Sequence, residues 1–226
     1  MIKAFLFDLD GTLVDTLADI AGFMNGILAE RGWPGHAVED YRRMVGRGFS
    51  ALVRSAAPAD ARYDFDEFYA HCFSVYKKMG SGESKPYPGA AETLAALSAR
   101  GIPLGVLSNK PDDITRAMVA ELFPSVPFGF VRGGILGKPL KPEPDGALEG
   151  AAALGVAPEH CAFVGDSDVD MHTAQAAGMP GVGASWGFRG ADELRAAGAA
   201  YIAASMLELP ALLAAAPLGL NAETRR

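Results

Sequence analysis

The stretch IKAFLFDLDGT, residues 2–12, decides the fold class and the kind of chemistry to expect. Apart from Lys3, its first six residues are apolar and rich in aromatic side chains, which is typical of a buried parallel strand. Asp8 and Asp10 follow two positions apart, so on leaving the strand both carboxylates point into one small volume. A divalent cation would resolve their repulsion, because Mg²⁺ prefers a carboxylate or two together with water and phosphate oxygens. Taken alone, the same Asp-x-Asp-Gly pattern is also compatible with a simple turn.

Apolar runs like the first one recur along the chain and alternate with helical segments. Further strands are expected at residues 102–107, 161–164, 181–184 and 200–202. Helices are expected at residues 89–100, 112–122, 145–154, 168–177 and 192–197. This alternation predicts an α/β fold, a Rossmann-like parallel sheet with helices on both faces. In such sheets the chemistry collects at the carboxyl ends of the strands.

One segment, residues 16–85, breaks this alternation. Apolar residues recur there at helical spacing in two stripes: Leu17, Ile20, Met24, Ile27 and Leu28, then Phe65, Phe68, Tyr69, Cys72, Phe73 and Tyr76. Gly80, Gly82 and the turn at 86–89 mark the return to the sheet. We therefore predict an all-helical insert, 16–85, within a discontinuous core of residues 1–15 and 86–226. The aromatic stripe is interpreted as core packing and not as a cofactor site.

Composition and charge exclude several classes of protein. Acidic residues outnumber basic ones by 27 to 20, a net charge of −7, and a field of this sign repels nucleic-acid backbones. A small phosphorylated substrate is not excluded, since its pocket can be locally positive or hold a metal. The apolar run before Asp8 is too short for a signal peptide, and no uncharged run reaches the roughly 18 residues that span a membrane. We expect a cytoplasmic protein that binds neither nucleic acid nor membrane.

Two further polar clusters carry candidate functional residues. Ser108, Asn109 and Lys110 lie next to a predicted helix, where a hydroxyl and backbone N–H groups can bind an anion. A Ser or Asn that simply caps the helix is an equally good interpretation of this cluster alone. Lys141 precedes a Pro-Glu-Pro run that stiffens the backbone, so we expect its ammonium to reach inward. Lys138, by contrast, is interpreted as a solvated surface lysine.

The last cluster is GDSDVD, residues 165–170, after the strand expected at 161–164. Asp166 and Asp170 are four positions apart where a helix is expected to begin, so both should face the same side. Asp168 points elsewhere, and we interpret it as a favourable charge at the helix N-terminus.

Together, and in this order at the strand ends, the four clusters resemble the haloacid dehalogenase superfamily of phosphohydrolases. The resemblance covers nearly the whole chain, and the helical insert looks like a cap of that superfamily's first class. VGRG at 45–48, GDS at 165–167, GMP at 178–180 and WGF at 186–188 are similar to the phosphoglycolate phosphatase subfamily in particular. Arg47 departs from that subfamily, in which a small polar residue is expected at this position.

The resemblance implies a phosphatase mechanism. Asp8 would be the nucleophile that takes the phosphoryl group, and a carboxylate can do so by forming an acyl phosphate. Asp10 would be the general acid toward the leaving oxygen and then the general base toward water, with Thr12 orienting it. Three groups would meet the phosphoryl oxygens: Ser108, the amide of Asn109 and Lys141.

The resemblance also implies Mg²⁺ as the cofactor. The ion would be held by a carboxylate oxygen of Asp8, the backbone carbonyl of Asp10 and Asp166, while Asp170 would hold metal-bound waters. The helical insert would close over the substrate and exclude water.

The expected reaction is hydrolysis of a small phosphorylated metabolite, with phosphoglycolate as the first candidate. The alternatives are a phosphatase of another metabolite, a phosphomutase with the same catalytic residues, and a phosphate-sensing relative without activity. Arg47 is the candidate for substrate choice, because a guanidinium beside a helix N-terminus can bind the carboxylate of phosphoglycolate. A solvent-exposed arginine in a glycine hinge is the competing interpretation. The sequence leaves both a monomer and a homodimer open.

Overall fold

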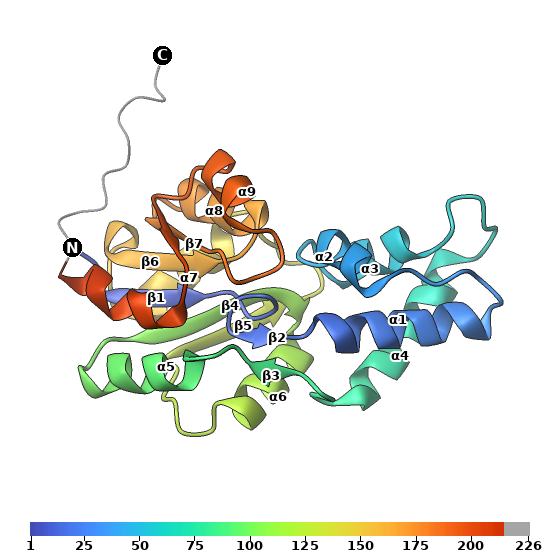
Figure 1. The fold of residues 1–226 in the computed structure, drawn as a ribbon, viewed down its shortest axis with the longest axis horizontal. Coiled ribbons are helices and arrows are strands. Elements are labelled where there is room, and N and C mark those ends of the chain that lie inside the picture. Colours follow the sequence, from blue (N-terminus) through green and yellow to red (C-terminus); the bar gives the residue numbers. More distant parts are fainter. Residues whose placement is uncertain (215–226) are drawn as a thin grey trace, which may run out of the picture.

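The computed structural model describes residues 1–214, and its centre is a parallel β-sheet (Figure 1). Within these residues six strands form the sheet: β1 (Ala4–Phe7), β4 (Leu104–Pro111), β5 (Phe130–Gly134), β6 (Cys161–Gly165), β7 (Gly181–Ala184) and β8 (Tyr201–Ala203). Their order is β5-β4-β1-β6-β7-β8, and each neighbouring pair is parallel. The strand order reverses beside β1, which favours a ligand site at its carboxyl end. Residues 215–226, which the prediction assigns to the core, lie outside the described residues.

Helices cover both faces of the sheet. Phe5 and Phe7 of β1 belong to the apolar core on one face, and Ala4 and Leu6 to the core on the other. The first face packs against α5 (Ala90–Ala99), α6 (Asp112–Leu122) and the 3₁₀ helix η3 (Met206–Leu213). The second face packs against α7 (Asp145–Ala153) and α8 (Asp168–Ala176). Two further elements follow α7 and β7: η2 (Pro158–His160) and α9 (Ala191–Ala196). The predicted α/β fold is confirmed.

The segment after the first strand is all helical. It is framed by a two-stranded antiparallel ribbon, β2 (Val14–Asp15) and β3 (Lys85–Pro86). Between these strands lie α1 (Leu17–Glu30), η1 (Val38–Asp40), α2 (Tyr41–Met44), α3 (Phe49–Ala56) and α4 (Phe65–Met79). They extend to the right of the sheet in Figure 1 and share an apolar core of their own, built from both predicted stripes. The action of residues 16–85 as a cap domain stays a prediction.

Two strands differ from the sequence prediction. β4 extends beyond the expected 102–107 to Pro111, so the Ser-Asn-Lys cluster forms the buried end of this strand, directly before the N-terminus of α6. β5 is absent from the prediction because its sequence, FVRGG, contains an arginine and two glycines where an apolar run is expected. Gly133 is required by close packing, since a Cβ there would lie 2.5 Å from the Cα of Asp112.

The helices are short compared with the thickness of a membrane. Among residues 1–214 no helix is long and apolar enough to cross one. The longest in this range, α4, has 15 residues, and its apolar stripe packs in the core of the helical insert.

Candidate active site

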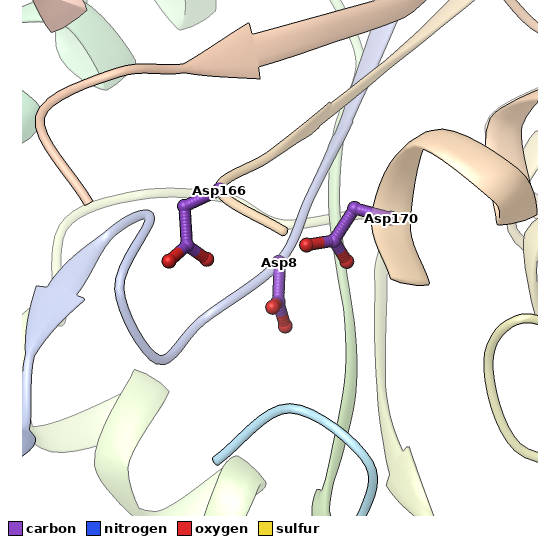
Figure 2. A group of neighbouring side chains, drawn as sticks. All are labelled: Asp8, Asp166 and Asp170. Carbon is purple, nitrogen blue, oxygen red and sulfur yellow. The ribbon is translucent and has the colours of Figure 1, made fainter. Parts of the chain in front are cut away.

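Three carboxylates meet where β1 and β6 end. Asp8 directly follows β1, Asp166 directly follows β6, and Asp170 lies in the first turn of α8 (Figure 2). The register of the sheet brings them together, because Phe7 of β1 is level with Val164 of β6. One oxygen from each carboxylate lies within 4.8 Å of the others, and all three residues are buried. The structure therefore gathers Asp8, Asp166 and Asp170 into one site.

Asp166 is held in place by the turn after Asp10 and by the loop after β7. The hydroxyl of Thr12 donates to Oδ1 of Asp166 (3.2 Å), and the backbone N–H of Phe188 donates to Oδ2 (2.7 Å). Gly11 has a φ of 81°, and a Cβ there would lie 2.3 Å from Oδ2 of Asp166. A side chain at position 11 would thus be strained and would collide with this carboxylate.

The hydroxyl of Thr12 has a different partner from the one that the sequence suggests. It is fully buried and donates to Asp166, whereas the sequence interpretation directs it to Asp10. The reason is a tight turn, in which the N–H groups of Thr12 and Val14 both donate to the carbonyl of Leu9. This turn brings the Thr12 side chain to the end of β6.

One ammonium group offsets part of the negative charge. Nζ of Lys141 lies 2.8 Å from Oδ1 of Asp8 and 2.6 Å from Oδ1 of Asp170, and its side chain is 2% exposed. Asn109 fixes the backbone of Lys141: its Oδ1 accepts from the N–H and its Nδ2 donates to the C=O, both at 2.8 Å. Lys141 therefore reaches inward, as its place before the Pro-Glu-Pro run suggested, and Asn109 is the residue that locks it there.

Asn109 and Ser108 lie side by side at the end of β4 but have different contacts. Nδ2 of Asn109 also donates to the carbonyl of Gly46 (2.9 Å), so this side chain joins the core to the helical insert. Oγ of Ser108 accepts from the N–H of Lys110 (3.2 Å) and borders the same cavity as Asp8. The side chain of Asn109 is engaged by backbone groups, whereas both residues line the cavity; contact of Ser108 or of the Asn109 amide with a phosphoryl group stays a prediction.

Asp170 has partners on both of its oxygens. Besides the contact of Oδ1 with Lys141, Oδ2 accepts from the N–H (3.1 Å) and the hydroxyl (2.6 Å) of Ser167. Asp166 lies before α8, which begins at Asp168. Its approach to Asp170 therefore results from the end of β6, and not from i, i+4 spacing on one helix as the sequence analysis expects.

Burial and repulsion from neighbouring charges favour the protonated forms of Asp8 and Asp166. Burial raises the pKa of Asp8 to about 7 against the attraction of Lys141, and repulsion from Asp170 and Asp10 adds to the rise. The pKa of Asp166 is raised by burial first and then by the charges of Asp170 and Asp8. A second cation would favour the charged forms. Clustered carboxylate oxygens are the ligands that hard divalent ions prefer, so these residues fit a bound metal.

A second buried ion pair, which is not predicted from the sequence, lies beside the carboxylates. Nζ of Lys110 lies 3.0 Å from Oδ1 of Asp10 and donates to the hydroxyl of Tyr76 on α4. Both Lys110 and Tyr76 are buried. The sequence does contain a signal for this pair. Lys110 follows an apolar run and Tyr76 belongs to an otherwise apolar stripe, and both a lysine and a tyrosine hydroxyl need a polar partner when they are buried.

A cavity lies between this pair and the helical insert. Core residues that include Asp8, Asp10 and Ser108 form one wall. Apolar side chains of the insert, among them Phe49 and Leu52, form the other. A small polar molecule at this position would therefore contact both the strand ends and the insert.

Arg47 is not among the residues that line this cavity. Its Nη2 lies 2.7 Å from Oδ2 of Asp168, and its side chain is 55% exposed. The neighbouring Gly46 and Gly48 do line the cavity. Asp168, interpreted from the sequence as a helix-terminal charge, thus has a specific partner in the insert. Contact between Arg47 and a substrate stays a prediction.

A parallel sheet with a helical insert after its first strand, and with carboxylates and a lysine at the strand ends, defines a class of hydrolase. The haloacid dehalogenase-like hydrolase family matches residues 2–178, and the chain belongs to this family.

Similar proteins indicate which kind of hydrolase this chain resembles. A phosphoglycolate phosphatase from Caulobacter vibrioides is 36% identical over 208 residues, 90% of this chain and 87% of the relative. A phosphoglycolate phosphatase from Rhodospirillum rubrum is 37% identical over 200 residues, 83% of this chain and 81% of the relative. The crystal structure of a predicted phosphoglycolate phosphatase from Haemophilus somnus superposes with a TM-score of 0.85 at 27% identity, covering 94% of this chain and 98% of the other. The predicted family and the predicted enzyme class, a phosphatase, are confirmed.

Proposed function

We propose that this enzyme is a Mg²⁺-dependent phosphatase that acts through a phosphoryl group on Asp8, with phosphoglycolate as its substrate. One observation carries the proposal: Asp8, at the end of the central strand, lies 2.8 Å from the ammonium of Lys141 and within 4.8 Å of two further carboxylates. A phosphoryl group needs positive charge around its oxygens and a nucleophile in line with phosphorus. This cluster offers both.

The contacts of Asp8 distinguish its two oxygens. Oδ1 faces Lys141 and also accepts from the N–H of Leu9 (2.7 Å). Oδ2 is then the atom that attacks phosphorus, forming the acyl phosphate as the bond to the ester oxygen breaks. Asp10, two residues further on, donates a proton to that leaving oxygen. Asp10 then takes a proton from the water that attacks the acyl phosphate, which releases inorganic phosphate and frees Asp8.

Lys141 and Ser108 bind the phosphoryl oxygens. The Lys141 ammonium is held by Asp170 and, through its backbone, by Asn109, so it needs no reorganisation when charge builds up on the phosphoryl group. The hydroxyl of Ser108 borders the cavity beside Asp8 and can donate to the same oxygens.

A divalent ion would be held by Asp8, Asp166 and the backbone carbonyl of Asp10. When bound, Mg²⁺ supplies positive charge to the transferring phosphoryl group. Thr12 and Phe188 orient the carboxylate of Asp166 for this purpose. Asp170 orients Lys141 and lies close enough to the other carboxylates to hold metal-bound water.

Phosphoglycolate is the substrate in the names of the two relatives. It is small enough for a cavity bordered by apolar side chains of the insert. The decisive experiment is a kcat/KM comparison of phosphate release from a panel of phosphorylated metabolites, with and without a chelator. We expect phosphoglycolate to lead the panel by at least about tenfold, roughly the worth of one charged hydrogen bond. A different leading substrate would refute the substrate assignment, and turnover that survives chelation would refute the metal.

Two further predictions accompany this proposal. A cytoplasmic location is expected and is consistent with the bacterial origin of the relatives. Neither nucleic acid nor a membrane is needed by a site of this kind, and a monomer and a homodimer are both compatible with it. An enzyme that releases phosphate from these metabolites would also exclude the phosphate-sensing alternative.

A further inference from the structure

The cavity beside Asp8 contains one cationic group that the mechanism does not use. Among the described residues that line the cavity, Lys110 is the one with a positive charge. Its side chain is 3% exposed, and its ammonium contacts Asp10 and the hydroxyl of Tyr76. An ammonium has three N–H donors, so these two partners leave one for a ligand.

Lys110 lies close to where a second polar group of the substrate would be. Asp10 must lie next to the ester oxygen that leaves with the substrate. Any second polar group one carbon away from that oxygen must then lie close to Asp10 as well. Lys110 Nζ is 3.0 Å from Oδ1 of Asp10, so it is within reach of such a group. The walls on the side of the insert are largely apolar and the Lys110 side chain is buried, and a low-dielectric surrounding strengthens the attraction between an ammonium and an anion.

Arg47, the candidate from the sequence, is placed less favourably. Its guanidinium pairs with Asp168 and does not line the cavity. To reach a substrate it would have to leave that partner, whereas Lys110 already borders the space beside Asp10.

We propose that Lys110 and Tyr76 together form a subsite for a second anionic group, such as a carboxylate, on the phosphorylated substrate. This inference rests on the proposed function and deepens it by naming the substrate class: short phosphorylated acids rather than phosphorylated alcohols or sugars. Lys110 supplies the charge from the core, and Tyr76 holds the ammonium from α4 of the insert. Recognition of the acid therefore depends on the position of the insert relative to the core.

The test uses matched pairs of substrates that differ in one charge. Phosphoglycolate is compared with phosphoglycolamide, and 3-phosphoglycerate with glycerol 3-phosphate. For each pair the ratio of kcat/KM for the acid to that for the neutral partner is measured in wild type and in variants. Because Lys110 also contacts Asp10, a variant can slow both members of a pair, and the ratio removes that common effect.

We expect Lys110→Met to lower the acid-to-neutral ratio by roughly 10- to 100-fold, the effect of losing one charged hydrogen bond. Tyr76→Phe, which keeps the ring and removes only the hydroxyl, should lower it by roughly two- to tenfold. Arg47→Ala is the matched control, because it removes a cation that does not line the cavity. It should leave the ratio within about twofold of wild type.

The outcomes separate the two proposals. If Lys110→Met erases the preference for 3-phosphoglycerate while phosphoglycolate is a poor substrate, the proposed substrate fails and the subsite stands. A preference that survives Lys110→Met but is lost in Arg47→Ala would overturn the subsite and leave the arginine hypothesis in place. A wild-type enzyme with no preference for the acid in either pair would also overturn it.

Discussion

Replacing Lys141 by methionine tests how much its buried ammonium contributes to the free energy of unfolding. The substitution keeps most of the unbranched side chain and removes the ammonium that lies 2.8 Å from Asp8 and 2.6 Å from Asp170. The two carboxylates are 7% and 0% exposed, so water cannot take over the role of the lost charge. They would be left close to Asp166 with no buried cation between them.

The size of the effect follows from this burial. Removing one partner of a buried ion pair costs about 3–5 kcal/mol, whereas a substitution at an exposed position stays within about 0.5 kcal/mol. Lys138 is exposed and lies in the same loop, so Lys138→Met is the matched control. Mg²⁺ should return part of the loss in Lys141→Met, because a cation among the carboxylates replaces the missing charge.

The assay is urea unfolding at neutral pH in the presence of a chelator, repeated with Mg²⁺. We expect the free energy of unfolding of Lys141→Met to fall by about 3–5 kcal/mol in the chelator and by less with Mg²⁺. A loss below about 1 kcal/mol, or one equal to that of Lys138→Met, would show that the buried charges are balanced in some other way.

Three further predictions concern the acid, the metal and the pH. Asp10→Asn should reduce kcat/KM more for alkyl phosphates than for aryl phosphates with good leaving groups, since only the former need a proton; equal losses would argue against an acid at this position. Asp166→Ala should raise the Mg²⁺ concentration for half-maximal activity by at least roughly tenfold, and an unchanged Mg²⁺ titration would remove Asp166 from the metal site. In the metal-free protein the pKa of Asp8 is raised from 3.8 to about 7, so the folded state holds a proton that the unfolded chain has lost. The stability from this group is therefore complete below pH 3.8 and is lost as the pH rises through about 7. Urea unfolding in a chelator should show a decline between about pH 5 and about pH 8, which Mg²⁺ flattens, and stability that increases over this range would contradict the assignment.

The sheet is predictable from the sequence because its strands are buried on both faces. The run at residues 2–7 and the one at 161–164 contain little but apolar side chains, which is the pattern that a central parallel strand requires. β5 lies at the edge of the sheet and lacks this pattern, since Arg132 and the adjacent glycine pack against neighbouring backbone and side chains. Its role depends on contacts with α6 and α7, which no local pattern contains.

The sequence predicts which residues gather at the site, but it does not predict which side chains contact one another there. Residues that follow parallel strands must gather at one edge, which is enough to bring Asp8 and Asp166 together. Lys141 follows β5, which the sequence does not predict, so only its inward direction could be inferred, from the adjacent Pro-Glu-Pro run. The direction of each side chain depends on residues far away in the chain. Thr12 and Asp166 are separated by 154 positions, and the turn that joins them is a detail of backbone geometry.

The contacts between the insert and the core are the least accessible to sequence reasoning. Tyr76 belongs to an apolar stripe that packs the insert, and this interpretation is correct for its ring. Its hydroxyl nevertheless reaches Lys110, and Arg47 reaches Asp168, across 34 and 121 positions respectively. Both contacts depend on how the insert lies against the sheet.

The most direct test of the account is to trap the phosphoryl group on the enzyme. Wild type is mixed with phosphoglycolate and Mg²⁺, quenched in acid within one turnover, digested, and analysed by mass spectrometry. The account predicts a phosphate adduct on the peptide that contains Asp8, and no adduct in Asp8→Asn, whose amide cannot form an acyl phosphate. An adduct on another residue, or full turnover by Asp8→Asn, would contradict it.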